Sequence, residues 1–269
     1  EGAAPCGDEV IEMETFDGDI PGEFDAVACV GVKGRSRVIV DAAKRQGVGV
    51  VYVDKGYFRY HQSKERGHWR VSIGGFQPTA FVRDAKCSRD RWRRLGVGVV
   101  APRTSPGAYI ILAGKSLKYH LFAGLPHPTE YAKKLVRDIR RYTNLPIIYR
   151  PKPSWGEAEP IPGTVYSPPE QRLDGLLPTA HALVTHGSAA SIEALIFGIP
   201  SIVLGLDVAA LVSDTQLSAV ANPSFPSLAV REQFLHNLAH CQWTEEEMRS
   251  GEAWRHIVSQ LAVLAEDKE

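Results

Sequence analysis

The chain has few sulfur-containing residues, no net charge and no long uninterrupted apolar stretch. Its 4 cysteines are scattered, without a Cys-x-x-Cys pair or a histidine at ligand spacing. The sequence therefore indicates neither a zinc site nor a disulfide framework, and it favours a reducing compartment. The most apolar window, residues 194–212, is interrupted by glycine, proline and aspartate, which favours buried strand and helix over a membrane span. With no basic apolar leader visible at the N-terminus, we expect a cytoplasmic protein.

The absence of net charge conceals an uneven distribution. Residues 55–94, called the basic block, contain eleven Lys and Arg residues against three acidic ones, so the block carries +8 and the rest of the chain −8. Aromatic side chains are interleaved with these cations. This composition suits a polyanion such as a nucleic acid, because phosphates meet the cations and exposed bases stack on the rings. A solvated basic face around core aromatics is the open alternative.

The apolar runs of the first hundred residues predict an α/β fold. Residues 26–30 and 48–53 have the composition of buried strands, and Ser36 can cap a helix between them that ends near Gln46. Two strands joined by a helix in this way form a parallel pair. A further short strand is expected near residues 70–73, inside an otherwise long loop.

The α/β pattern restarts after a Gly- and Pro-rich stretch at residues 96–106, which we expect to be a linker. The sequence therefore predicts two α/β domains, at residues 1–105 and 106–251. The further strands expected are residues 109–112, 146–149, 182–184 and 201–204, and the further helices are residues 83–94, 129–142, 170–177, 230–239, 244–250 and 252–265.

The stretch from Thr185 to Pro200 organises the second domain. It reads as a tight polar turn and a helix between two buried strands, with Ser188 as the N-cap and Gly198 at the helix end. The small side chains of the turn leave room for an anion at the unpaired N–H groups of the first helical turn. An ordinary strand–helix unit with small residues for close packing is the alternative. The residues expected to contact such an anion or an attached ribose are His186, Gly187, Ser188, Ala189 and Glu193.

This stretch resembles the donor-nucleotide motif of GT-B glycosyltransferases, particularly the capsule-polysaccharide and Kdo-transferase-like group. In these enzymes a Ser/Gly turn follows a strand, and a helix runs into Glu-Ala-Leu-x-x-Gly-x-Pro, which residues 193–200 match. The resemblance implies an α/β fold of two Rossmann-like parallel-sheet domains facing a cleft. Residues 1–105 would form the acceptor side and residues 106–251 would bind the nucleotide sugar, with a last helix in residues 252–269 packing back on the first domain. The co-substrate implied is a UDP-sugar, or alternatively a CMP-sugar, used without a metal or another cofactor.

A second match follows the strand expected at residues 146–149. Arg150-Pro-Lys152-Pro stands where the resembling families have a Lys-Pro-His-Pro-like motif, although the histidine is missing here. The basic residues of that motif face the donor phosphates, which implies the same role for Arg150 and Lys152. Two solvated cations beside prolines are the alternative. The loop at residues 114–116 lacks the glycine spacing of a P-loop and is expected to approach either the donor or the acceptor.

A catalytic base is expected in the first domain. Asp54 and Gly56 match part of the Glu-Asp-Gly-Phe sequence that ends the equivalent strand of the capsule enzymes, although Lys55 intervenes. Because ligands of open α/β sheets lie beyond the carboxyl ends of strands, Asp54 is the first choice for the base, followed by His61 and His68. An enzyme that retains configuration needs no protein base.

The basic block suggests the acceptor. Residues 69–78 also resemble uncharacterised phage-encoded members of the superfamily, so the favoured acceptor is a hydroxymethylated pyrimidine base in DNA, modified in the host cytoplasm. The alternatives are a saccharide or lipid-linked glycan acceptor, a nucleotide-sugar epimerase and a non-catalytic DNA-binding module. The residues expected to face the acceptor are Lys33, Lys55, Arg59, Trp69 and Arg70.

Overall fold

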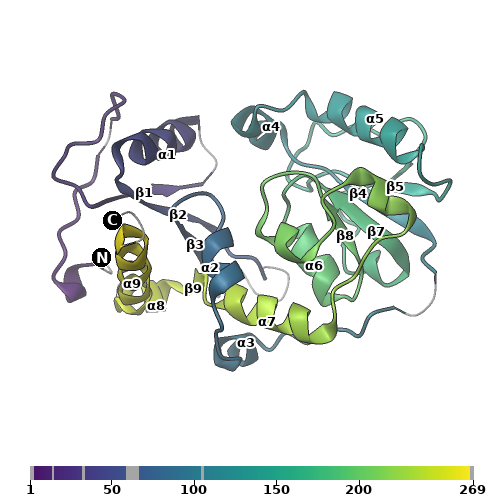
Figure 1. The fold of residues 1–269 in the computed structure, drawn as a ribbon. Helices are drawn as coiled ribbons and strands as arrows, with labels where there is room; N and C mark the ends of the chain where they lie inside the picture. Colours follow the sequence, from purple (N-terminus) through teal and green to yellow (C-terminus); the bar gives the residue numbers. More distant parts are fainter. Residues whose placement is uncertain (1–2, 14, 32–33, 59–66, 104–105, 267–269) are drawn as a thin grey trace. The chain divides into compact units, whose positions relative to one another are not determined.

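The chain divides by its contacts into two compact units, each built around its own sheet (Figure 1). Unit 1 comprises Glu1–Ala80 and Leu238–Glu269, and unit 2 comprises Phe81–Asn237. The computed structural model describes residues 3–13, 15–31, 34–58, 67–103 and 106–266.

This division groups residues 81–105 with unit 2, whereas the sequence analysis places them in the first domain. The functional boundary at residue 105 stays a prediction, as does the arrangement of two domains around a cleft. Within the described residues, no helix is both long and apolar enough to cross a bilayer.

Unit 1 is built on a mixed four-stranded sheet with the order β1-β2-β3-β9. The elements are β1 (Ala26–Val30), α1 (Gly34–Gln46), β2 (Gly49–Lys55), β3 (Trp69–Ile73) and β9 (Gln242–Trp243). As the sequence predicts, β1 and β2 run parallel, with α1 between them in the chain. The expectation of a wholly parallel sheet is wrong for this unit, because β3 and β9 run antiparallel to their neighbours. β3 begins opposite the end of β2, where Trp69 pairs with Lys55. An antiparallel strand can follow its neighbour in this way without the crossover connection that a parallel strand needs.

Apolar contacts cover both faces of this sheet because the side chains of β2 alternate. Val50 and Tyr52 lie in one cluster with Val40 of α1. Val51 lies in another with Ala253, which belongs to the C-terminal helix α9. The last helices of the unit are α8 (Glu245–Arg249), which begins with a capping box, and α9 (Glu252–Glu266).

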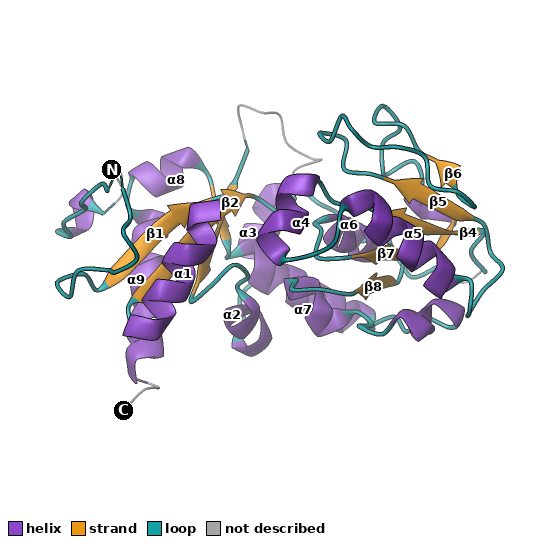
Figure 2. Cartoon of the chain, turned by 90° about the horizontal axis from the view of Figure 1, so that it is seen from above, coloured by secondary structure: helices purple, strands orange, loops and turns teal. Residues whose placement is uncertain are grey.

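Unit 2 is built on a five-stranded sheet in which all strand pairs are parallel, as predicted (Figure 2). Its strands are β4 (Tyr109–Ala113), β5 (Ile147–Arg150), β6 (Val165–Tyr166), β7 (Ala180–Thr185) and β8 (Ser201–Val203). The order β6-β5-β4-β7-β8 means that the chain builds outward from β4 to β6 and then returns to place β7 on the other side of β4. The direction of growth reverses between β4 and β7. Ligands of open parallel sheets bind at such a reversal, beyond the carboxyl ends of the strands.

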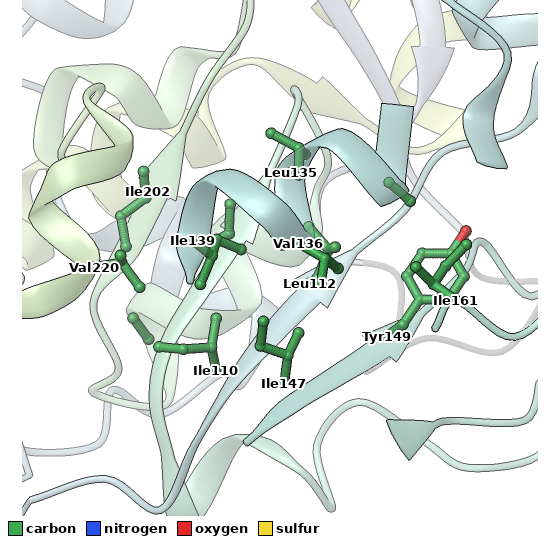
Figure 3. Close-up of a cluster of buried hydrophobic side chains, with 13 residues drawn as sticks. Ile110, Leu112, Leu135, Val136, Ile139, Ile147, Tyr149, Ile161, Ile202 and Val220 are labelled. Atoms are coloured by element: carbon green, nitrogen blue, oxygen red, sulfur yellow. The ribbon is translucent and has the colours of Figure 1, made fainter. Parts of the chain in front are cut away.

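Two apolar cores follow from the alternation along β4. Ile110 and Leu112 lie in a cluster with Ile139 of α5 (Pro128–Ile139), as Figure 3 shows. Ile111 lies in the cluster of the opposite face, with Ala194 of α6 (Ala190–Ile196). The sheet is therefore covered by helices on both sides, and only its strand ends are open for a site.

The remaining helices correct two expectations. They are α2 (Thr79–Asp84), α3 (Asp90–Leu95), α4 (Leu117–Ala123) and α7 (Leu228–Ala239). The expectation of a single helix over residues 83–94 is wrong, because the chain forms two helices there, α2 and α3. Between them, the Asn237 amide accepts from Cys87 N at 3.0 Å and donates to Ala85 O at 2.8 Å. A helix at residues 170–177 is also wrong. This segment folds as turns before a 3-10 helix, η4 (Leu177–Thr179), and the Leu173 carbonyl accepts the N–H groups of two following residues.

Candidate functional site

The carboxyl edge of the unit 2 sheet brings together the segments that the sequence assigns to the donor. The last residues of three strands are in register, Arg150 opposite Ala113 and Ala113 opposite Thr185. The loops that follow β5, β4 and β7 therefore leave the sheet side by side. The loops after β4 and β7 also flank the point where the strand order reverses.

A left-handed glycine shapes the turn after β7. Gly187 has a φ of +70°, and a Cβ there would lie 2.6 Å from the Tyr119 hydroxyl oxygen and 2.9 Å from the Leu206 carbonyl oxygen. Real side chains do not make such contacts, and Leu206 contributes backbone that cannot rotate away. The turn therefore requires glycine for its own geometry, in addition to any role in admitting an anion.

The N-terminus of α6 differs from the expectation in its cap. Ala189, with helical φ and ψ, is the N-cap residue instead of Ser188, and α6 is only 7 residues long. The Ser188 hydroxyl oxygen accepts from Ala190 N at a long 3.4 Å. In the part of the chain that the structure describes, the backbone N–H groups of Ser188 and Ala189 make no hydrogen bond, and Ala189 is exposed. Two amide donors are therefore available to a ligand in this turn.

Asp207, which the sequence analysis did not select, fixes the back of this turn. The residue is 5% exposed, and its carboxylate accepts from Ser191 Oγ at 3.1 Å and from Ala209 N at 3.0 Å. Ser191 Oγ is also 2.6 Å from the Ser188 carbonyl oxygen, so its single hydrogen is shared between this carbonyl and Asp207. The loop after β8 is thus tied to the first turn of α6, so the position of the two amides is set by buried contacts.

The loop after β4 reaches the same turn through Lys115. Its Nζ donates to the Gly187 carbonyl oxygen at 2.6 Å and lies 3.9 Å from the centroid of the Tyr119 ring. The sequence left this loop open between donor and acceptor. The contact with Gly187 brings it to the donor motif.

His186 supports the turn from the face of α5. Its Nδ1 is 2.7 Å from the Tyr131 hydroxyl, and a side chain at Gly205 would overlap its ring. Burial lowers the pKa of His186, and the nearby His120 and Lys115 lower it further, so the ring is neutral at pH 7. Tyr131 was missed by the sequence analysis, because no local pattern connects it to a residue 55 positions away.

Two residues predicted to contact the donor, Arg150 and Glu193, interact electrostatically. Burial lowers the pKa of Arg150, against the attraction of the Glu193 and Asp174 carboxylates, and the guanidinium stays charged. Arg150 Nη2 donates weakly to the Gln171 carbonyl oxygen at 3.4 Å, and its Nε is buried without a hydrogen bond among the described residues. Lys152, two residues further on, is exposed. Arg150 therefore offers a charged guanidinium near Glu193 whose Nε can still donate a hydrogen bond.

The unit 1 candidates form a different kind of cluster. Asp54 Oδ2 accepts from Arg70 Nη2 at 3.1 Å, and its Oδ1 accepts from Lys55 N at 2.8 Å. The Arg70 guanidinium also lies 5.6 Å from the Tyr52 ring centroid and 5.3 Å from that of Tyr57. Asp54 and Arg70, predicted for catalysis and for the acceptor, are thus brought together as an ion pair, while Arg70 Nε makes no hydrogen bond among the described residues.

The other predicted residues are less informative. His68 and Trp69 are half-buried at the start of β3, and Lys55 is exposed at the end of β2. Lys33, Arg59 and His61 lie outside the residues that the structure describes. Among the residues that are described, no group of three or more His, Cys, Asp and Glu side chains could hold a metal ion.

The fold and this edge place the chain among α/β proteins with a parallel sheet. No protein-family model matches it, and no curated protein matches it. Among solved structures, the chain is similar to Thermosulfurimonas dismutans KpsC, beta Kdo 2,4 transferase, with 15% identity over 80% of both chains and a TM-score of 0.47. It is also similar to Thermosulfurimonas dismutans KpsC, beta Kdo 2,7 transferase, with 15% identity, coverage of 81% of this chain and 76% of that chain, and a TM-score of 0.48. TM-scores this low do not establish a shared fold.

Proposed function

We propose that the protein is a glycosyltransferase that moves a sugar from a nucleotide-sugar donor to a hydroxyl group. The observation that carries the proposal is the carboxyl edge of the unit 2 sheet. The amides of Ser188 and Ala189, which make no hydrogen bond among the described residues, lie there together with Arg150 and Glu193, next to the reversal of strand order. These positions match the donor motif of GT-B enzymes in the sequence.

The chemistry of the transfer explains why these groups are needed. The bond between the anomeric carbon and the donor phosphate oxygen breaks, and a bond from the acceptor oxygen to that carbon forms. Negative charge grows on the leaving phosphate, where the two amides and the Arg150 guanidinium stabilise it. Glu193 accepts hydrogen bonds from the ribose hydroxyls, and the exposed Lys152 adds attraction at longer range.

For an inverting reaction, Asp54 stays the candidate base. Both of its carboxylate oxygens already accept a hydrogen bond, one from Arg70 and one from the Lys55 amide. One of these bonds must give way when an acceptor hydroxyl donates its proton. His68 and His61 are the next candidates, and a retaining reaction would send the proton to the leaving phosphate instead.

For the acceptor, we propose a saccharide or a lipid-linked glycan rather than DNA. The basic block that motivates DNA is divided, with residues 55–80 in unit 1 and residues 81–94 in unit 2. Some of its cations are also engaged, since Arg70 pairs with Asp54, Arg83 pairs with Asp84, and Arg91 is buried. The charge available to a polyanion is therefore smaller than the composition suggests.

A thermal-shift screen with UDP-, GDP-, CMP- and dTDP-sugars tests the function, followed by mass spectrometry with saccharide acceptors and with DNA containing hydroxymethylcytosine. We expect one nucleotide class to raise the melting temperature and a saccharide to gain the mass of one sugar. A sugar gained by the DNA instead would restore the DNA acceptor. Interconversion of the donor sugar without an acceptor would indicate an epimerase. DNA binding with steep salt dependence and no response to any nucleotide sugar would end the enzyme proposal.

A further inference from the structure

The lysine in the loop after β4 has a position that the donor motif alone does not explain. Lys115 follows the strand at which the sheet order reverses, and its Nζ donates to the Gly187 carbonyl oxygen at 2.6 Å. The Tyr119 ring lies 3.9 Å from the same Nζ. These two contacts place the ammonium against the donor turn.

The two histidine rings near Lys115 do not carry a positive charge of their own. Burial lowers the pKa of His120 and of His186, and the ammonium lowers both further, so the two rings are neutral at pH 7. Lys115, His120, Tyr131 and His186 line a cavity of about 20 Å³, which has room for one water molecule. Because these surroundings are partly buried, the ammonium is screened less than a surface lysine is.

We propose that Lys115 binds the phosphate of the donor nucleotide, an assignment that rests on the proposed function. An ammonium has three N–H donors, so Lys115 can donate to a phosphate oxygen while it keeps the Gly187 carbonyl. The phosphate then receives backbone N–H groups from Ser188 and Ala189 and a charged donor from the neighbouring loop. Tyr119 is a positioning residue, because its ring fixes the ammonium without contacting the ligand.

Isothermal titration of the full chain with UDP and CMP, and with the nucleosides uridine and cytidine, tests this assignment. The variant Lys115→Gln removes the charge but keeps an N–H donor for the Gly187 carbonyl. Lys118→Gln is the matched control, an exposed lysine on the following helix. We expect Lys115→Gln to weaken the nucleotide by about tenfold or more and to change the nucleoside affinity by less than about twofold. Lys118→Gln should change neither.

Several outcomes would overturn the assignment, and they are distinguishable. Unchanged nucleotide affinity in Lys115→Gln would show that the lysine does not reach the phosphate. An equal loss for nucleotide and nucleoside would show that it only supports the turn. If the wild-type chain binds no nucleotide, the proposed function itself fails. If Lys115→Gln does not fold, Lys115→Arg decides, because it keeps the charge and should bind the nucleotide within about threefold of wild type.

Discussion

Units 1 and 2 each place polar groups where sheet strands end, but they satisfy these groups differently. In unit 1, Arg70 forms an ion pair with Asp54 and lies against the ring of Tyr57, although its Nε makes no hydrogen bond among the described residues. In unit 2, within the described residues, Arg150 makes no ion pair, and neither its Nε nor the Ser188 amide has a hydrogen-bond partner. Buried or partly buried polar groups without partners are rare in folded proteins unless a ligand or water satisfies them. We therefore expect the ion pair of unit 1 to stabilise the fold and the groups at the unit 2 edge to stabilise a bound anion.

This difference separates two measurements. Substitutions in the unit 1 cluster should change the free energy of unfolding and leave nucleotide affinity unchanged. Substitutions at the unit 2 edge should change nucleotide affinity, except where they also distort the turn. The four predictions that follow test this separation, and their expected effects decrease in size.

The largest effect is expected from Gly187→Ala, which should lower both the free energy of unfolding and the nucleotide affinity. The added Cβ meets the Tyr119 hydroxyl and the Leu206 backbone at a positive φ, so we expect a loss of about 3 kcal/mol in unfolding free energy and no measurable nucleotide binding. Gly156→Ala is the control, because a Cβ there has no atom within 4 Å and its φ is ordinary. Its effect should stay below about 1 kcal/mol. Urea denaturation followed by circular dichroism measures both, and equal effects would show that the turn is not rigid.

Arg70→Met should destabilise unit 1 without touching the nucleotide. The Arg70 and Asp54 side chains are only 14% and 29% exposed, so removal of one partner leaves a partly buried charge and costs about 2 kcal/mol. Arg83→Met breaks an ion pair whose side chains are 61% and 63% exposed, and should leave the free energy of unfolding almost unchanged. Denaturation curves and nucleotide titrations should be run on both variants. Weakened nucleotide binding with unchanged stability in Arg70→Met would reverse the comparison.

Glu193→Ala is expected to lower nucleotide affinity by about tenfold, because the ribose loses a charged acceptor. The side chain is half-buried on α6, so the free energy of unfolding should change by less than about 1 kcal/mol. Glu170→Ala, at an exposed glutamate of the same unit, serves as the control in titration calorimetry. Unchanged donor affinity in Glu193→Ala would remove this residue from the site.

The sequence predicts the local elements of the fold better than their order in space. The strand before Gly187 and the helix after it follow from apolar runs, because both are set by neighbouring residues. The antiparallel pairing of Trp69 with Trp243 joins residues far apart in the chain, and no periodicity encodes it. The return of β7 to the side of β4 is of the same kind, since only the assembled sheet shows where its order reverses.

The residues of the candidate site also differ in whether a local sequence pattern identifies them. Arg150 and Glu193 could be selected because each lies in a short motif that is contiguous in the sequence. Lys115 and Tyr131 could not be assigned, because their contacts with Gly187 and His186 exist only once β4, α5 and β7 lie side by side. Asp207 was missed for the same reason, since its bond to Ser191 joins the loop after β8 to the first turn of α6.

The smallest effect concerns pH, and it tests whether the turn of unit 2 is supported by neutral histidines. Burial lowers the pKa of His186 and of His120 below their ordinary value of 6.5. Below about pH 6.5 the unfolded chain therefore binds more protons than the folded one, so stability is complete above this pH and is lost as the pH falls. The slope is at most about 1.4 kcal/mol per pH unit for each proton. His186→Gln should make the free energy of unfolding fall less than in wild type between about pH 7 and pH 5. Both proteins are also measured at about pH 8, where the histidine is neutral in the folded and the unfolded chain. Parallel curves for the two proteins would mean that His186 binds its proton as readily in the folded chain as in the unfolded one. The bond to Tyr131 would then not hold a neutral ring beneath the donor turn.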